Sequence, residues 1–197
     1  MHSVGGITLH DVINNRFAKK AVEKGADGLI AVAAGAGGHA GRLSPFPLIS
    51  EIRNWFDGPL ALSGAIASGD AILAAEAMGA DFGYIGSAFI ATHEARADDR
   101  YKQMIVDSAA DDIIYSSLFT GVHGNYLAPS VKAAGMDPNN LPEGDISTMD
   151  FDNWDKKPKA WKEIWGCGQG IGAVKSVLTV DDLVSVSYTH LTLPTKD

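Results

Sequence analysis

Short apolar runs alternate with amphipathic segments along the first half of the chain. The apolar runs cover residues 7–14, 28–34, 60–63 and 82–86, and continuous runs of this length are typical of buried strands. Between them, residues 15–24, 45–56 and 69–78 carry apolar positions at helical spacing. Strands that alternate with helices predict an α/β fold built on a parallel sheet.

Two near-identical pentapeptides mark a repeat within this pattern. They are Lys24-Gly25-Ala26-Asp27-Gly28 and Met78-Gly79-Ala80-Asp81-Phe82. In each, glycine is predicted to end a helix and Ala-Asp to lead into the next strand. The repeat indicates that one βα unit occurs at least twice.

The periodicity changes after residue 89. Residues 97–108 predict a helix and residues 113–120 an apolar segment, whereas residues 135–159 are rich in Pro, Asp and Asn. Three indoles lie in or near that last segment: Trp154, Trp161 and Trp165. We interpret them as side chains that anchor a long inserted segment to the rest of the fold. The alternative is that they form a wall of a substrate pocket.

The C-terminal part begins with the glycine-rich segment 166–172. It predicts a loop that opens a helix through Val174, Val177 and Leu178. Residues 186–197 are expected to break the helical register that begins at Asp181, and they resemble translated cloning sequence. Because the chain starts with a predicted strand, we also expect that at least one preceding βα unit of the parent protein is missing.

Composition narrows the class of protein. The 197 residues are fewer than the roughly 250 of a complete eight-stranded barrel. A net charge of −8 argues against nucleic acid and anionic membranes as partners. The single cysteine, Cys167, excludes an internal disulfide and fits a reducing cytoplasm, with a structural role as the favoured interpretation. No signal peptide, membrane span or metal site is predicted.

Three small glycine-bearing motifs follow three successive predicted strands. They are Gly37-Gly38-His39, Ser63-Gly64-Ala65 and Gly86-Ser87, with 26 positions from Gly38 to Gly64 and 22 from Gly64 to Gly86. That spacing fits one βα unit each, and parallel strands gather their carboxyl ends at one edge. Bare backbone N–H groups there suit an anion such as phosphate. Close helix–strand packing is the alternative use of these glycines.

Four motifs together resemble the nitronate monooxygenases, a family that includes FMN-dependent enoyl-acyl-carrier-protein reductases. The motifs are Ala36-Gly37-Gly38-His39-Ala40-Gly41, Leu62-Ser63-Gly64-Ala65-Ile66-Ala67, Met78-Gly79-Ala80-Asp81 and Tyr84-Ile85-Gly86-Ser87-Ala88-Phe89. Gly168-Gln169-Gly170 is similar to a further family motif. The resemblance runs from about residue 7 to residue 183.

The resemblance implies a TIM barrel with a helical insertion that holds FMN at the carboxyl ends of its strands. This chain would supply about strands five to eight: a half-barrel over residues 1–92, an insertion over 93–165, and a closing glycine loop and helix over 166–185. The implied FMN contacts are Gly37, Gly38, Ser63, Gly64, Gly86, Ser87, Gln169 and Gly170.

The implied activity is FMN-dependent oxidation of alkyl nitronates with oxygen, and a homodimer is possible. An enoyl-thioester reductase that uses NAD(P)H is the nearest alternative. Catalysis is assigned to His39, whose imidazole would bond the flavin or polarise a substrate oxygen, although a role in orienting its loop is the alternative. His10 is a weaker candidate at a similar position.

Two departures from the family pattern bear on the mechanism. Where one branch of the family has a catalytic histidine, this chain has Phe17, which cannot act as a base. In the insertion, Val122-His123-Gly124 replaces an expected arginine. His123 and Tyr126 could face the pocket, but loop packing is the favoured interpretation for both.

Two further alternatives concern the whole chain. One is an inactive phosphate-binding half-barrel, and the other is a barrel of the inosine monophosphate dehydrogenase group, which the position of Cys167 beyond the last predicted strand argues against. An isolated half-barrel is expected to aggregate or dimerise. The side chains expected to lose partners across the barrel are Ile30, Val32, Leu60, Leu62, Tyr84 and Ile85.

Overall fold

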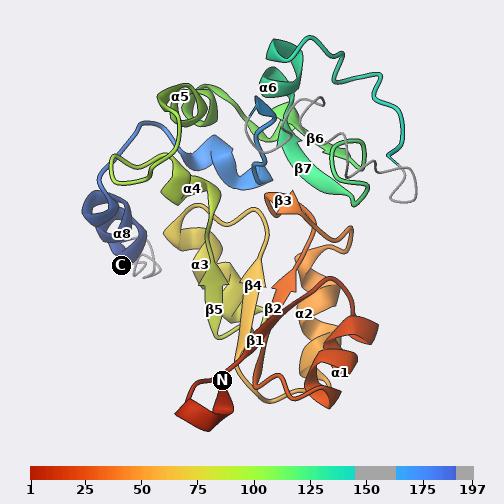
Figure 1. Cartoon of the computed structure of the whole chain (residues 1–197). Coiled ribbons are helices and arrows are strands. Elements are labelled where there is room, and N and C mark those ends of the chain that lie inside the picture. Colours follow the sequence, from red (N-terminus) through yellow and green to blue (C-terminus); the bar gives the residue numbers. More distant parts are fainter. Residues whose placement is uncertain (145–162, 190–197) are drawn as a thin grey trace.

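A four-stranded parallel sheet forms the lower half of the molecule (Figure 1). The computed structural model describes residues 1–144 and 163–189. After the short 3-10 helix η1 (His2–Val4), the strands are β1 (Leu9–Val12), β2 (Gly28–Val32), β4 (Leu60–Ser63) and β5 (Phe82–Tyr84), in the order β1-β2-β4-β5. The predicted α/β fold with a parallel sheet is thus confirmed.

Helices α1 (Asn15–Glu23), α2 (Pro45–Arg53) and α3 (Gly69–Ala77) each follow a strand and cover one face of this sheet. Side-chain caps fix the N-termini of α1 and α3. The Asn14 carboxamide oxygen accepts the Phe17 N–H at 2.9 Å, and the Ser68 hydroxyl accepts the Ala71 N–H. The core between sheet and helices includes Leu29, Ala31, Leu48, Ile49, Ile52, Leu60 and Leu62.

The opposite face of the sheet is uncovered along its edge strand β5, although Val32 and Ala61 on the same face are buried. Strand register places Ile30 beside Ala61 and Ala61 beside Phe82, so these side chains share one face. Phe82 is 57% exposed and Tyr84 56% exposed. Leu60, Leu62 and Ile85 were wrongly expected on this face, because successive side chains alternate and these three lie on the helix-covered side. Leu60 and Leu62 are fully or almost fully buried, and Ile85 packs against the same core.

The repeated pentapeptides build the same hydrogen-bonded ring twice. The Asp27 carboxylate accepts the Thr8 N–H at 2.6 Å, and the Asp27 N–H donates to the Thr8 carbonyl at 2.9 Å. Asp81 makes the same pair of bonds to Leu60, at 2.8 and 2.7 Å. Arg53 also binds the Asp81 carboxylate, at 2.6 Å. Each aspartate therefore ties the start of its own strand to the start of the preceding one.

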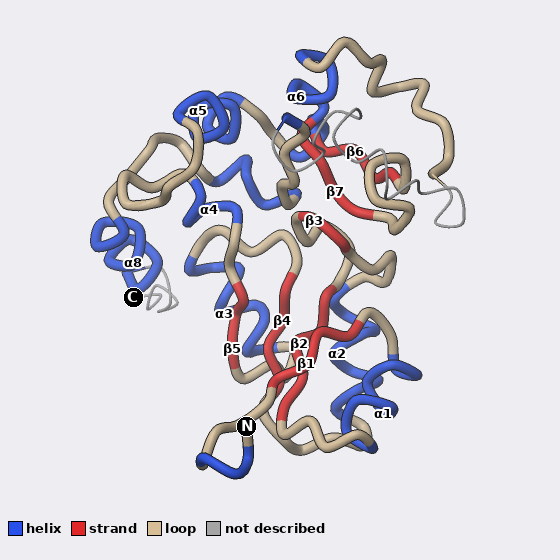
Figure 2. The backbone as a smooth tube through the Cα atoms, viewed as in Figure 1, coloured by secondary structure: helices blue, strands red, loops and turns tan. Residues whose placement is uncertain are grey.

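The upper half of the molecule contains the segments that follow β5. They are α4 (Ser87–Ile90), α5 (Asp99–Asp107), η2 (Ala110–Asp112), β6 (Ile113–Ser116), β7 (Gly124–Leu127) and α6 (Ala128–Ala133). A second, antiparallel sheet has the order β3-β7-β6, in which β3 (Gly38–His39) comes from the loop after β2 (Figure 2). This sheet joins the glycine loop to the later half of the chain.

The C-terminal segment differs from its prediction. A 3-10 helix, η5 (Gln169–Ala173), is followed by non-helical residues, and α8 (Val180–Thr189) starts later than expected. The Thr179 hydroxyl accepts the Asp182 N–H at 3.0 Å and thereby caps α8, which explains why the helix does not include Val174, Val177 and Leu178. The helical register also continues past residue 186.

Of the three indoles, only Trp165 falls within the described residues. Its ring is buried and stacks on Tyr101 with centroids 4.9 Å apart, in agreement with an anchoring role. Trp154 and Trp161 lie outside the described residues. Within residues 1–144 and 163–189, no helix has the length and apolar character needed to cross a bilayer.

The uncovered sheet face predicts self-association of this chain. Burial of a large apolar side chain stabilises a contact by roughly 1.5–3 kcal/mol, and Phe82 is available for it. The wild-type chain should form dimers or larger species in sedimentation velocity at micromolar concentration, and Phe82→Glu should shift it toward monomer.

Phe46 on α2 supplies the matched control, because it is 68% exposed but lies on a helix outside this face. Phe46→Glu should leave the association unchanged. A wild-type chain that stays monomeric, or equal effects of the two substitutions, would contradict the assignment.

The hydrogen bonds of the Asp81 carboxylate predict that the free energy of unfolding decreases at acid pH. Burial raises the pKa of Asp81, but the Leu60 N–H and Arg53 outweigh it, so the pKa lies below its ordinary 3.8. The carboxylate therefore contributes stability above pH 3.8, and this is lost as pH falls through the lower folded-state pKa. Asp81→Asn should cost about 1 kcal/mol at pH 7 and weaken the pH dependence in urea titrations. As a control, Asp57→Asn replaces an exposed carboxylate and should change neither the free energy of unfolding nor its pH dependence.

Candidate functional site

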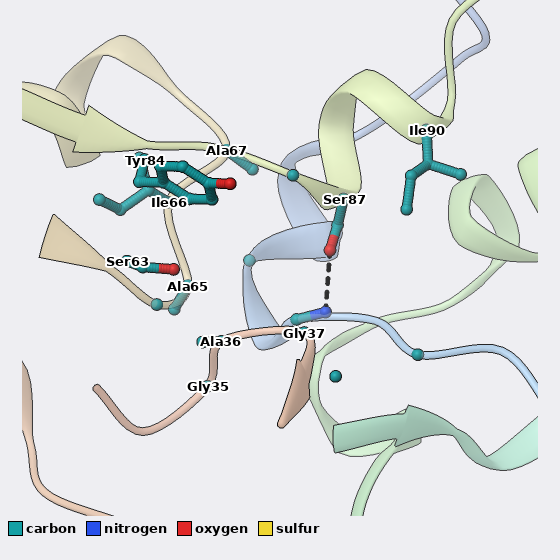
Figure 3. Close-up of a pocket in the computed structure, with 16 residues that line it drawn as sticks. Gly35, Ala36, Gly37, Ser63, Ala65, Ile66, Ala67, Tyr84, Ser87 and Ile90 are labelled. Atoms are coloured by element: carbon teal, nitrogen blue, oxygen red, sulfur yellow. Dashed lines mark hydrogen bonds between the residues drawn. The ribbon is translucent and has the colours of Figure 1, made fainter. Parts of the chain in front are cut away.

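A cavity of about 180 Å³ opens at the carboxyl ends of β2, β4 and β5 (Figure 3). Four segments of the chain line it: the loops after β2, β4 and β5, as the spacing of the glycine motifs predicts, and the segment around Gly168. The lining residues are Gly35, Ala36, Gly37, Gly38, Ser63, Gly64, Ala65, Ile66, Ala67, Tyr84, Gly86, Ser87, Ile90, Gly166, Gly168 and Gly170. The structure thus brings together seven of the eight residues predicted to contact a cofactor.

Glycine is required where the loops around this cavity touch. A Cβ atom on Gly37 would lie 2.9 Å from the Gly168 nitrogen, and one on Gly64 would lie 2.9 Å from the Ala34 carbonyl oxygen. Gly64 also has φ +141°, a conformation that favours glycine. These contacts leave backbone atoms, rather than side chains, as the surface that a ligand meets.

The segment around Gly168 forms a further wall of the cavity. The Gly168 N–H donates to the Ser87 hydroxyl oxygen at 2.9 Å, the bond drawn in Figure 3. The Gln169 N–H donates to the Gly35 carbonyl, also at 2.9 Å. Gln169 itself is exposed and does not line the cavity. Its backbone helps to hold the wall, and its predicted contact with a cofactor stays a prediction.

Asn125, which no sequence motif marks, binds two of the cavity walls. Its side chain is buried, and Nδ2 donates to the Ala36 carbonyl at 2.7 Å. Its backbone carbonyl accepts the Cys167 N–H at 3.1 Å. One residue of β7 therefore positions both the loop after β2 and the segment that enters η5.

Tyr84 is a second residue that the sequence analysis did not assign to the site. It is the last residue of β5 and lines the cavity at the end of that strand (Figure 3). It is the one aromatic side chain among the lining residues. Its exposed ring and phenol oxygen offer a stacking surface and a hydrogen-bonding group to a ligand.

The described residues that line the cavity include no charged side chain. An anion would therefore be held by backbone N–H groups and by hydroxyl groups such as those of Ser63 and Ser87. This arrangement fits a phosphate ester, because glycine backbone can approach its oxygens closely.

His39 lies next to the cavity but does not line it. It is the second residue of β3, directly after the lining residue Gly38. Its Nε2 atom lies 2.8 Å from the Thr120 hydroxyl oxygen. The imidazole is thus held by the later half of the chain, and its predicted catalytic role stays a prediction.

The remaining candidates lie elsewhere. His10 Nδ1 lies 2.8 Å from the Asp11 carbonyl oxygen, and His10 and Phe17 line a separate hollow of about 420 Å³ beside β1 and α1. His123 stacks on Tyr115 with centroids 4.9 Å apart, and Tyr126 is fully buried against Phe119. Loop packing is therefore the role the structure supports for His123 and Tyr126.

Cys167 directly precedes the lining residue Gly168 and is fully buried. Burial raises its pKa to about 11, although a Ser87 hydrogen bond acts in the opposite direction. The thiol is therefore protonated at neutral pH and unsuited to attack a substrate. Within the described residues, no group of three His, Cys, Asp or Glu side chains is arranged to hold a metal ion.

Comparison with known proteins assigns the chain to a family. The family model described as nitronate monooxygenase matches residues 2–187. The chain belongs to this family of enzymes, as the four motifs suggested.

Individual relatives agree with this assignment. The chain is 29% identical to a nitronate monooxygenase of Paraburkholderia phytofirmans over 141 residues, which cover 67% of this chain and 38% of that protein. It is similar in structure to nitroalkane oxidase from Streptomyces ansochromogenes, with a TM-score of 0.78 and 26% identity over 96% of this chain and 58% of that one. FabK from Thermotoga maritima shares the fold, with a TM-score of 0.73 at 20% identity over 95% of this chain and 61% of that one.

Proposed function

We propose that this chain binds FMN through the glycine-lined cavity and serves the oxidation of alkyl nitronates. The observation that carries the proposal is the wall of close-packed glycine loops without a charged side chain. A phosphate ester fits such a wall, and the family assignment supports nitronate chemistry. The chain spans 38% of the length of the curated relative above, so the activity is that of the whole protein to which these residues would contribute.

The proposal extends to the place of this chain in a barrel. We infer that β1, β2, β4 and β5 correspond to about strands five to eight of a TIM barrel. Support comes from their parallel order and from the uncovered apolar face, which a closed barrel would turn inward. Residues 93–165 would then form the insertion and residues 166–185 the closing segment, while the foreign origin of residues 186–197 stays a prediction.

Within this site, each group of residues has a distinct task. Gly37, Gly38, Gly64, Gly86 and Gly170 would hold the phosphate and ribityl end through backbone groups, with Ser63 and Ser87 as hydroxyl partners. Bound FMN would supply the electron-transfer chemistry, and the protein would supply position and electrostatics.

The substrate would meet the side chains near β3. His39 would orient a nitronate or take up a proton, and Tyr84 would exclude water from one side. Phe17 supplies no base, which favours a substrate that is already an anion.

An enoyl-thioester reductase remains the second candidate, since FabK shares the fold. Turnover with NADH and an enoyl thioester, compared with turnover of a nitronate and oxygen, separates the two activities. The inosine monophosphate dehydrogenase alternative receives no support, because the thiol of Cys167 is buried and protonated.

Gly86 provides the sharpest test of the cofactor site. It lines the cavity, has φ −117°, and a Cβ atom there would meet nothing within 4 Å. Gly86→Val should therefore fold normally but fill the ligand's space. We expect FMN affinity, measured by fluorescence titration, to fall at least about 100-fold, or about 2.7 kcal/mol, with little change in Tm.

Gly172→Val is the matched control, since a Cβ atom there also meets nothing within 4 Å and Gly172 does not line the cavity. It should retain wild-type affinity. FMN binding by Gly86→Val as tight as wild type would show that the phosphate lies elsewhere.

The absence of a base at Phe17 predicts substrate preference. Preformed alkyl nitronates should be oxidised with a kcat/KM about 10²-fold or more above that of the neutral nitroalkanes, which must first lose a proton. Oxygen consumption with both forms at one pH measures the ratio. Similar values would mean that another residue, with His39 as the first candidate, removes the proton.

A further inference from the structure

The His39 ring is bound by Thr120, a residue of the loop between β6 and β7. Its Nε2 atom lies 2.8 Å from the Thr120 hydroxyl oxygen, although the two residues are 81 positions apart in sequence. The backbone of His39 is fixed as well, because β3 pairs it with Gly124 of β7. A Cβ atom at Gly124 would lie 2.8 Å from the Gly38 carbonyl oxygen, so glycine permits this close pairing.

The hydrogen bonds of Thr120 define the direction of its bond to His39. The Thr120 hydroxyl oxygen lies 2.9 Å from the Val122 carbonyl oxygen, which can only accept a hydrogen bond. Two oxygens at that distance repel each other unless a hydrogen lies between them. A hydroxyl group has one hydrogen, and this contact uses it.

The hydroxyl oxygen of Thr120 must therefore accept in its other contacts. The Val122 N–H points to it at 3.4 Å, and His39 Nε2 must carry a hydrogen and donate it. The two contacts with Val122 and the one with His39 are satisfied together only when His39 is protonated at Nε2. In the neutral imidazole, Nδ1 then has the lone pair.

We propose that Thr120 is a positioning residue that holds His39 in the Nε2–H tautomer, so that any proton His39 takes up during turnover goes to Nδ1. The link to turnover rests on the proposed function, whereas the tautomer does not. Thr120 is partly exposed, so its replacement by the isosteric valine should remove the hydroxyl without unfolding the chain.

Nuclear magnetic resonance of protein labelled with ring-¹⁵N histidine tests the tautomer. Long-range ¹H–¹⁵N spectra should show His39 with a protonated Nε2 and an unprotonated Nδ1, and His39→Gln identifies its signals. Thr120→Val should move both nitrogen shifts toward the average of two exchanging tautomers, whereas Thr120→Ser should keep the wild-type pattern. A protonated Nδ1 in the wild type, or no change in Thr120→Val, would overturn the proposal.

Tyr126→Phe is the control for neighbouring groups. Burial raises the pKa of Tyr126, and a contact with Thr120 acts in the opposite direction, so Thr120→Val also alters that contact. Tyr126→Phe removes the phenol and leaves the Thr120–His39 bond in place. It should therefore keep the wild-type histidine spectrum, and a spectrum like that of Thr120→Val would assign the effect to Tyr126 instead.

Steady-state kinetics with a nitronate then separate the two proposals. His39→Gln should lower kcat/KM about 10²-fold, Thr120→Val about 10-fold, and Thr120→Ser should restore activity to within about 2-fold of wild type. If His39→Gln stays fully active, the catalytic role of His39 is wrong even where the spectra show the expected tautomer. If Thr120→Val changes the tautomer but not the rate, Thr120 does not position His39 for turnover.

Discussion

The close contact between glycine loops is the constraint on which the site depends. Gly37 packs against Gly168 and Gly170 against Ala65, each too closely for a Cβ atom. These contacts bring together loops from both halves of the chain and leave backbone groups on the cavity wall. A side chain at either position would separate the walls, and the surface suited to a phosphate would be lost.

The sheet below supplies the rigid base for these loops. Asp27 and Asp81 each bind the backbone of the residue at the start of the preceding strand, so the strands enter the sheet in a defined register. The carboxyl ends of β2, β4 and β5 then lie side by side, and their loops converge. Asn125 of the second sheet then binds both the loop after β2 and the segment before η5 through hydrogen bonds.

Local pattern was enough to predict the four strands of the parallel sheet, the first three helices and the glycine loops. The repeat Gly-Ala-Asp and the spacing of Gly38, Gly64 and Gly86 encode βα units within a short window of sequence. The face of a strand was harder: Leu60 and Leu62 lie in a continuous apolar run, which does not show which side the helices cover.

Long-range contacts could not be predicted from such patterns. Asn125 binds Ala36 across 89 positions, and a buried asparagine in an apolar segment looks like a loop residue when only its neighbours are known. Thr120 reaches His39 in the same way. The late start of α8 follows from a threonine cap at Thr179, a signal that the sequence contains but that the glycine-rich segment before it obscured.

A titration of ¹⁵N-labelled protein with FMN and with riboflavin tests the central claim most directly, because the two ligands differ by the phosphate alone. The account predicts that FMN shifts the backbone amide signals of Gly37, Gly64, Gly86 and Ser87, and that riboflavin binds more weakly and shifts them less. Equal affinity and equal shifts for the two ligands, or FMN-induced shifts confined to residues away from these loops, would contradict it.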